Sequence, residues 1–123
     1  KQDSRQFLLE SMSLTPRLTQ EVSGEESNLP DNYAKLFMIG DRKEDIPEHI
    51  MIRSKLGIDY GYITECAYIQ DTDHNISYFL TATCHVNKNK IYNDDDYEYS
   101  DGISFMAELG RLIHNYMIAN KNK

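Results

Sequence analysis

Hydrophobic residues recur at helical spacing near both ends of the chain. Residues 4–14 carry one such pattern, which Pro16 interrupts, and residues 103–118 carry a longer one. The apolar positions of the first are Phe7, Leu8, Leu9 and Met12, and those of the second are Ile103, Met106, Leu109, Ile113 and Met117. These patterns predict a short N-terminal amphipathic helix and a C-terminal helix that packs on a sheet, with Ser100 or Asp101 as its N-cap.

Between the two helices the pattern changes to that of strands. Three segments rich in Ile, Val, Thr, Tyr and Phe lie at residues 49–55, 60–70 and 77–86. Gly57 and Gly61 mark a first turn, and the polar residues 71–75 mark a second. Short turns favour antiparallel pairing of consecutive strands, so residues 49–86 are predicted to form a three-stranded meander. The predicted fold class is therefore α+β: a helix, a long irregular connection, a three-stranded antiparallel sheet and a C-terminal helix packed on the sheet.

The connection at residues 15–47 is polar and irregular, apart from an apolar segment at residues 33–39 that is predicted to form one or two helical turns. A connection of this length is unusual inside a compact domain unless it is functional or crosses other structure. In addition, the strands at 60–70 and 77–86 lack a wholly polar face, and such strands are usually covered on both sides. Residues 1–123 are therefore expected to form one domain, and to be the C-terminal fragment of a longer protein.

The composition limits the classes of partner. Twenty acidic residues against thirteen basic ones give a formal charge of −7, which disfavours a nucleic-acid partner, and the basic residues form no cluster. No stretch reaches the ~20 apolar residues that a membrane helix requires. Neither a nucleic-acid partner nor a membrane segment is expected for this chain.

The two cysteines, Cys66 and Cys84, lie within predicted strands and lack the spacing of a zinc site. They are interpreted as buried free thiols, with a cross-strand disulfide as the alternative. The four histidines are scattered along the chain, and His85 is interpreted as a satisfied or half-exposed strand residue and not as a base.

Two acidic segments resemble cation sites in composition. Asp71, Asp73 and Asn75 begin like a calcium loop, but Ile76 replaces its glycine and Ala82 its bidentate glutamate, so a hairpin turn is predicted there. The run of three aspartates at residues 94–96 is interpreted as a solvated loop. The sequence therefore predicts no metal site and no cofactor.

One segment carries candidate chemistry. Lys55-Leu56-Gly57 stands at the end of a predicted strand, and a further glycine, Gly61, follows shortly after. The triplet resembles the Lys-Thr-Gly element of class A beta-lactamases and penicillin-binding proteins. In that family the element lies on a strand that lines the active site, and a hairpin then leads to a C-terminal helix. The order of elements is similar over nearly the whole chain, which implies that they belong to the family's α/β/α fold.

The resemblance implies roles for four residues. Lys55 would be the active-site lysine, whose positive charge helps to bind a substrate carboxylate and tunes proton transfer near the nucleophile. Gly57 would let the substrate approach the strand, and the amide of Ile58 would be one of the two oxyanion-hole donors. Leu56 departs from the family pattern, since Thr or Ser usually stands there to hold the carboxylate, and this favours an atypical substrate over penicillins. The alternative is that Lys55 is a solvated strand-end lysine and Gly57 a turn glycine.

The family's nucleophile is missing from the sequence. It is the serine of a Ser-x-x-Lys motif, and no serine of this chain has a lysine three residues later. The resemblance therefore implies the C-terminal portion of a serine hydrolase, which transfers an acyl group from an amide or ester and needs the N-terminal part of the same protein. It also implies a bacterial protein that is periplasmic, secreted or a cell-surface lipoprotein. The second hypothesis is a non-catalytic α+β module that self-associates or binds a protein through apolar surface.

Overall fold

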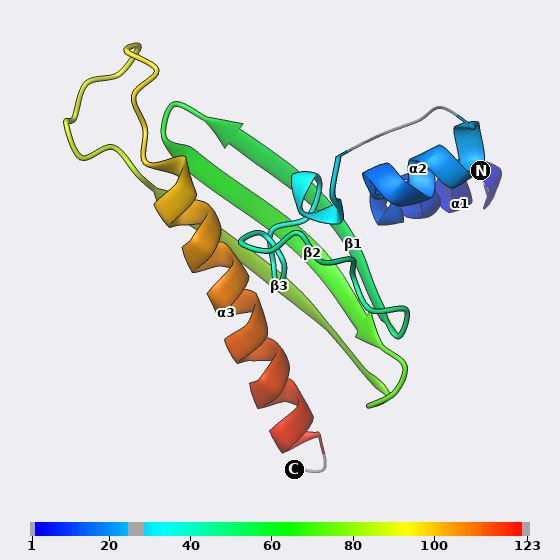
Figure 1. The fold of residues 1–123 in the computed structure, drawn as a ribbon. Helices are drawn as coiled ribbons and strands as arrows, with labels where there is room; N and C mark the ends of the chain where they lie inside the picture. Colours follow the sequence, from blue (N-terminus) through cyan, green and yellow to red (C-terminus); the bar gives the residue numbers. More distant parts are fainter. Residues whose placement is uncertain (1, 25–28, 122–123) are drawn as a thin grey trace.

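The structure, a computed structural model, describes residues 2–24 and 29–121. Its helices are α1 (Gln2–Ser13), α2 (Pro16–Ser23) and α3 (Tyr99–Asn120), its 3-10 turn is η1 (Asp31–Tyr33), and its strands are β1 (Ile50–Asp59), β2 (Tyr62–Asp71) and β3 (Ile76–His85). The strands form one antiparallel sheet in the order β1-β2-β3 (Figure 1). The predicted fold class, including the C-terminal helix packed on the sheet, is confirmed.

The β1–β2 hairpin is tighter than the sequence predicted. β1 continues through Gly57 to Asp59, so the predicted turn beginning at Gly57 is wrong, and the turn consists of Tyr60 and Gly61 alone. Both turn residues have positive φ, 47° and 80°, as a two-residue type I′ turn requires. A β-carbon on Gly61 would lie 2.8 Å from the carbonyl oxygen of Val86, so this position also requires glycine for space.

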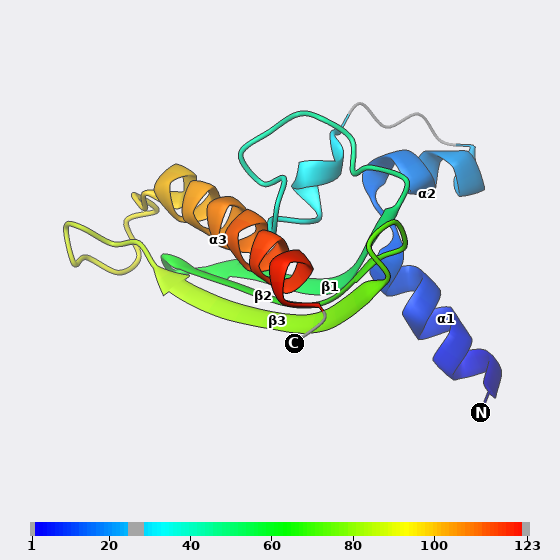
Figure 2. The same cartoon turned by 90° about the horizontal axis from the view of Figure 1, so that it is seen from below.

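The two faces of the sheet are covered unequally. α3 and the connection that precedes β1 lie over one face, whereas α1 lies on the opposite side beside β1 (Figure 2). The apolar core lies under α3, and its buried members include Leu36, Phe37, Ile52, Ile63, Ile69 and Met106. We call the other side the open face; its residues include Arg53, Lys55, Cys66, Tyr68, Phe79, Thr81, Thr83 and His85. The expectation that both faces are covered therefore holds only in part, since the side chain of Phe79 is 79% exposed.

A buried carboxylate fastens the connection to the sheet. Glu65 of β2 is fully buried, and its Oε2 accepts hydrogen bonds from the backbone N–H groups of Leu36, at 3.0 Å, and Phe37, at 2.8 Å. Burial raises the pKa of Glu65, while Ser54, the two amides and the charge of Lys35 act in the opposite direction. Lys35 is itself buried, which lowers its pKa, and its Nζ donates to the carbonyl oxygen of Met12.

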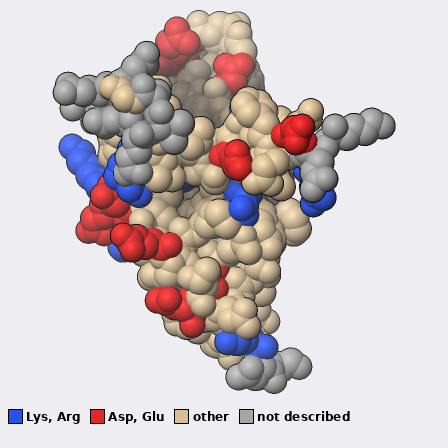
Figure 3. All heavy atoms as spheres, turned by 90° about the vertical axis from the view of Figure 1, so that its right-hand side faces the viewer, with Lys and Arg blue, Asp and Glu red and all other residues tan. Residues whose placement is uncertain are grey.

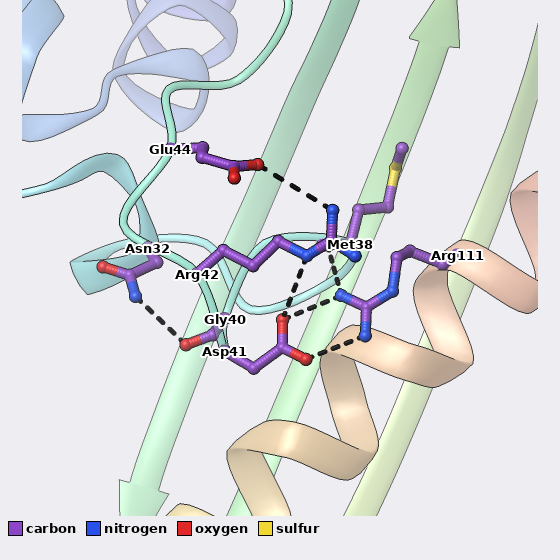
Figure 4. A network of polar contacts seen from close by, with 7 residues as sticks. All are labelled: Asn32, Met38, Gly40, Asp41, Arg42, Glu44 and Arg111. Atoms are coloured by element: carbon purple, nitrogen blue, oxygen red, sulfur yellow. Dashed lines mark hydrogen bonds and ion pairs between the residues drawn. The ribbon is translucent and has the colours of Figure 1, made fainter.

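Helix α3 packs directly on the same connection. Gly110 faces the backbone of Phe37 and Met38, where a β-carbon would collide with the Met38 nitrogen. The next residue, Arg111, donates from both terminal nitrogens to the carboxylate of Asp41, each at 2.8 Å, and also to the carbonyl oxygen of Met38 (Figure 4). Close backbone approach and a bidentate ion pair therefore fix the connection between the sheet and α3.

Several predicted boundaries are wrong. Ser100 and Asp101 lie inside α3, which begins at Tyr99, so neither is its N-cap. The connection at 15–47 contains helix α2, because Pro16 occupies the first helical position and the Oγ1 of Thr15 accepts a hydrogen bond from Leu18 N–H. Residues 25–28 of that connection lie outside the described residues. The apolar segment at 33–39 forms turns and buries Leu36, Phe37 and Ile39 in the core, whereas Tyr33 is exposed.

None of the described helices is long and apolar enough to cross a membrane. This agrees with the sequence, in which no apolar stretch has the necessary length.

The close approach at Gly110 is testable. We expect Gly110→Ala to lower the free energy of unfolding by about 1–3 kcal/mol, because the new methyl group must displace the Met38 backbone. Urea unfolding followed by circular dichroism measures the change. The matched control is Gly57→Ala, since a β-carbon there meets nothing within 4 Å and should leave stability almost unchanged. Equal losses in the two variants would contradict the packing described for α3.

Candidate functional site

The residues predicted to carry chemistry lie on β1, at an edge of the sheet. β1 is hydrogen-bonded to β2 on one side, and no described strand pairs with its other side. The type I′ turn sets the register of the hairpin, and the hydroxyl of Tyr99 accepts a hydrogen bond from Gly61 N–H at 2.9 Å. The end of β1 is therefore held firmly by β2 and by the start of α3.

The antiparallel ladder decides which backbone groups of β1 point outward. In such a ladder, directly opposed residues alternate between hydrogen-bonded and non-hydrogen-bonded pairs. The bond from Thr72 N–H to the carbonyl of His49 places the odd-numbered residues of β1 in the bonded pairs. The N–H of Ile58 and the carbonyl of Leu56 consequently point away from β2, at the free edge. Among the described residues, Ile58 N–H has no hydrogen-bond partner.

The lysine side chain reaches the same edge. Lys55 is exposed on the open face, and its Nζ donates to the outward carbonyl of Leu56 at 2.9 Å. The Leu56 carbonyl and the Ile58 N–H are neighbouring outward groups of this strand, so an ammonium and an amide donor occur close together. The ammonium carries a positive charge, and the N–H presents the positive end of its dipole to the edge. The pair therefore suits a negatively charged oxygen of a ligand.

The remaining predicted residues are divided between the two faces. Gly57 lies on the open face with free space around it, and its φ is outside the left-handed region. Leu56 is half-buried and packs against the core under α3, opposite in direction to Lys55. The structure thus brings Lys55, Gly57 and the Ile58 amide together but turns the Leu56 side chain away. Their roles in binding or catalysis stay predictions.

The cysteine interpretation is wrong for one of the two thiols. Cys66 is exposed on the open face, directly opposite Lys55 in the register, and Thr81 Oγ1 donates to its sulfur at 3.2 Å. Cys84 is half-buried on the α3 side, where burial raises the pKa of its thiol. A cross-strand disulfide is excluded, because the two thiols point to opposite faces and both cysteines are free.

A buried polar cluster was not predicted from the sequence. The Oδ2 of Asp71 lies 3.1 Å from His114 Nε2, and His114 Nδ1 lies 2.9 Å from the hydroxyl of Tyr78. The same carboxylate receives His74 Nδ1 at 2.7 Å. In neutral His114 the proton is therefore assigned to Nε2, which donates to Asp71, and Nδ1 accepts from Tyr78. No local sequence pattern links these residues, because Asp71 lies at the end of β2 and His114 lies in the C-terminal helix.

Burial dominates the electrostatics of this cluster. It lowers the pKa of His114, although the carboxylate of Asp71 opposes the shift. Burial together with the same carboxylate raises the pKa of Tyr78 to about 12. For Asp71, burial raises the pKa, but the hydrogen bonds from the His74 backbone and ring act more strongly in the opposite direction and hold the pKa below its usual value. At neutral pH the cluster therefore contains one ionised carboxylate and neutral His114 and Tyr78.

The turn that follows Asp71 is a hairpin turn, as predicted, with His74 N–H donating to Asp71 Oδ1 at 3.0 Å. Within residues 2–24 and 29–121, no group of three histidine, cysteine or acidic side chains is placed to hold a metal ion. His85 is exposed and stacks on Tyr62, with ring centroids 4.1 Å apart.

One side of the molecule shows charges of both signs. On the side of the molecule that carries the N-terminal helices and the β1 edge, acidic and basic side chains are interspersed over a mainly uncharged surface (Figure 3). A phosphate backbone would find no continuous basic strip on the coloured atoms of this side.

The His114 cluster makes the stability of the fold dependent on pH. Because the folded pKa of His114 lies below its ordinary value of 6.5, the unfolded chain takes up a proton first as the pH falls. The contribution of neutral His114 to the free energy of unfolding is present above about pH 6.5. Below that pH it declines by up to about 1.4 kcal/mol per pH unit for one proton. Urea unfolding between about pH 8 and pH 5 measures this slope. His114→Leu should reduce the slope of the unfolding free energy against pH, whereas the exposed control His85→Leu should leave this slope unchanged. An unchanged slope in His114→Leu would contradict the role given to His114.

No protein-family model, no curated protein and no solved structure matches this chain. Its function is therefore inferred from the geometry of the β1 edge and of the surfaces around it.

Proposed function

We propose that this chain is the C-terminal portion of a serine hydrolase of the beta-lactamase and penicillin-binding type, and that it is inactive alone. One observation carries the proposal: at the free edge of β1 the Lys55 ammonium binds the outward carbonyl of Leu56, and the unpaired N–H of Ile58 is the next outward group along the strand. Acyl transfer by a serine passes through a tetrahedral intermediate whose oxygen becomes negative, and preorganised donors stabilise that charge. In the proposed enzyme the Ile58 amide supplies one such donor, while Lys55 attracts a substrate carboxylate and tunes proton transfer.

The nucleophile has to come from another part of the protein. No serine of this chain is followed by the lysine of a Ser-x-x-Lys motif, and Ser54, the serine nearest to Lys55, is buried beside Glu65. The open face beside Lys55 and Gly57 offers space for the missing part, since neither residue is covered by a described side chain. A nucleophile approaching the free edge of β1 would face both the ammonium and the amide.

The second edge of the sheet supports the same proposal. β3 is ten residues long, and the strand contains no proline, lysine or other residue that usually protects an exposed edge. Its outward backbone groups are those of Ser77, Phe79, Thr81, Thr83 and His85, because the alternate residues bond to β2. Such an edge is a template for another strand, which the rest of the hydrolase would provide.

Leu56 bears on which substrate the proposed enzyme would accept. Its side chain packs under α3 and has no hydroxyl, so it contributes nothing to binding a carboxylate. We therefore propose an amide or ester substrate that differs from penicillins. By its resemblance to secreted and lipoprotein hydrolases of bacteria, the protein would act in the periplasm or at the cell surface.

A fluorophosphonate probe tests the proposal, since it reacts with activated serines without needing a carboxylate. Intact-mass spectrometry should find one adduct on the longer polypeptide that contains this chain and none on residues 1–123 alone. Lys55→Ala in the longer protein should slow adduct formation by about 100-fold, the usual effect of removing one preorganised charge or donor. The control is Lys43→Ala, which removes an exposed lysine elsewhere.

Two results would overturn the proposal: no adduct on the longer polypeptide, or equal labelling rates of Lys55→Ala and the unmodified protein. A parallel incubation with a penicillin tests whether the missing hydroxyl at Leu56 limits acylation. Efficient acylation by it would show that the missing hydroxyl at Leu56 does not limit recognition of the carboxylate.

The alternative function is a non-catalytic module that self-associates. It is favoured by the outer side of α3, where Phe105, Leu112 and Tyr116 are 52%, 65% and 61% exposed. Their spacing places them along one stripe of the helix, away from the sheet, and such stripes are typical of protein interfaces.

Sedimentation velocity distinguishes the alternative. If the chain is a self-associating module, it should form dimers at micromolar concentration, and Leu112→Asp should weaken association by about tenfold or more. Ser104→Asp, an exposed position on the same helix, adds the same charge and serves as control. A chain that stays monomeric at all concentrations contradicts the module hypothesis.

A further inference from the structure

A hollow of about 410 Å³ lies between helix α1 and the open face of the sheet. One wall is α1, which contributes Arg5, Leu9 and Met12, a spacing of four and three residues that places them on one side of the helix. α1 is on the side of the sheet opposite α3 (Figure 2), so the hollow is separate from the main core. Its volume lies in the range of small-molecule sites, about 300–1,000 Å³.

The floor of the hollow is apolar and aromatic. Tyr68 and Phe79 are cross-strand neighbours whose ring centroids are 4.9 Å apart, with a tilt of 45°. Phe79 remains 79% exposed, which is unusual for a phenylalanine in the middle of a strand. An apolar group lying on Phe79, between Leu9 and Met12, would remove this surface from water.

The charged groups of the hollow are all of one sign. Arg5 and Arg53 line it and no carboxylate does, although the chain has twenty acidic residues against thirteen basic ones. Neither guanidinium forms an ion pair with any described residue. Arg53 donates from Nη1 only to the neutral amide oxygen of Gln70, at 2.7 Å, and its Nε is buried without a hydrogen-bond partner. A partly buried guanidinium that lacks an anion and has one buried, unpaired N–H is unfavourable, so its position beside the hollow points to a missing negative partner.

We propose that this hollow binds a small amphiphilic carboxylate. Its carboxylate pairs with the Arg53 guanidinium, with Arg5 adding positive charge, and its aliphatic or aromatic tail covers Leu9, Met12 and Phe79. The charge-assisted hydrogen bonds fix the orientation of the ligand, and the apolar walls supply most of the contact area. The site involves no covalent step and does not depend on the hydrolase proposal.

Isothermal titration with sodium octanoate and with 1-octanol tests the site. The 123-residue chain should bind octanoate at one site with a Kd of about 0.1–1 mM, as expected for a ligand of this size, and 1-octanol about tenfold more weakly. Arg53→Met removes the guanidinium but retains an unbranched apolar side chain. It should weaken octanoate binding about tenfold without changing the binding of 1-octanol. The matched control is Arg42→Met, which removes an exposed arginine of the connection and should leave both affinities unchanged.

Phe79→Glu provides an independent variant, because an exposed side chain can be replaced with little effect on folding. It places a negative charge in the hollow and should weaken octanoate binding by about tenfold or more even if Arg53→Met does not fold. The proposal is overturned by equal affinities for octanoate and 1-octanol, by no saturable octanoate binding up to about 10 mM, or by octanoate binding that survives Phe79→Glu unchanged.

Discussion

Glu65 lies in the central strand with its carboxylate under α3, where it accepts hydrogen bonds from the backbone N–H groups of Leu36 and Phe37. An ionisable group in such a place must be hydrogen-bonded, and its burial already raises its pKa. Because these two amides belong to the long connection, the bonds hold it over the sheet and bring Leu36 and Phe37 into the core. Gly110 then lets α3 lie against the same backbone. Sheet, connection and helix are therefore positioned through one buried carboxylate.

This arrangement concentrates the packing on one side of the sheet. The core, the Glu65 carboxylate and the His114 cluster all lie toward α3, which leaves the opposite face and both sheet edges accessible. The features that suit chemistry or binding are found on that less covered side. Lys55 and the Ile58 amide lie at the β1 edge, and the hollow with Arg5 and Arg53 lies under α1. A rigid, well-packed face thus supports a polar and partly uncovered one, as binding sites require.

Several features of the fold and site follow from sequence patterns that depend on local geometry. Alternation within a strand assigns Lys55 and Leu56 to opposite faces, whereas the faces of Cys66 and Cys84 depend on the register between β2 and β3. Gly61 predicts part of the tight turn, but Gly57 was misassigned because a glycine can also lie in a strand. The helix at residues 16–23 was missed for a similar reason, since a proline can begin a helix as well as end one.

By itself the sequence determined the types of the main elements, their antiparallel order and the Lys55-x-Gly57 spacing, because periodicity and turn residues act over a few neighbours. Only the tertiary structure decided which face of the sheet is covered, and so it left Cys66 exposed and buried Glu65. It also brought His114 to Asp71 and placed Arg53 opposite α1. These contacts join residues that are distant in the sequence, and the way packed elements dock against one another is not encoded in any short pattern.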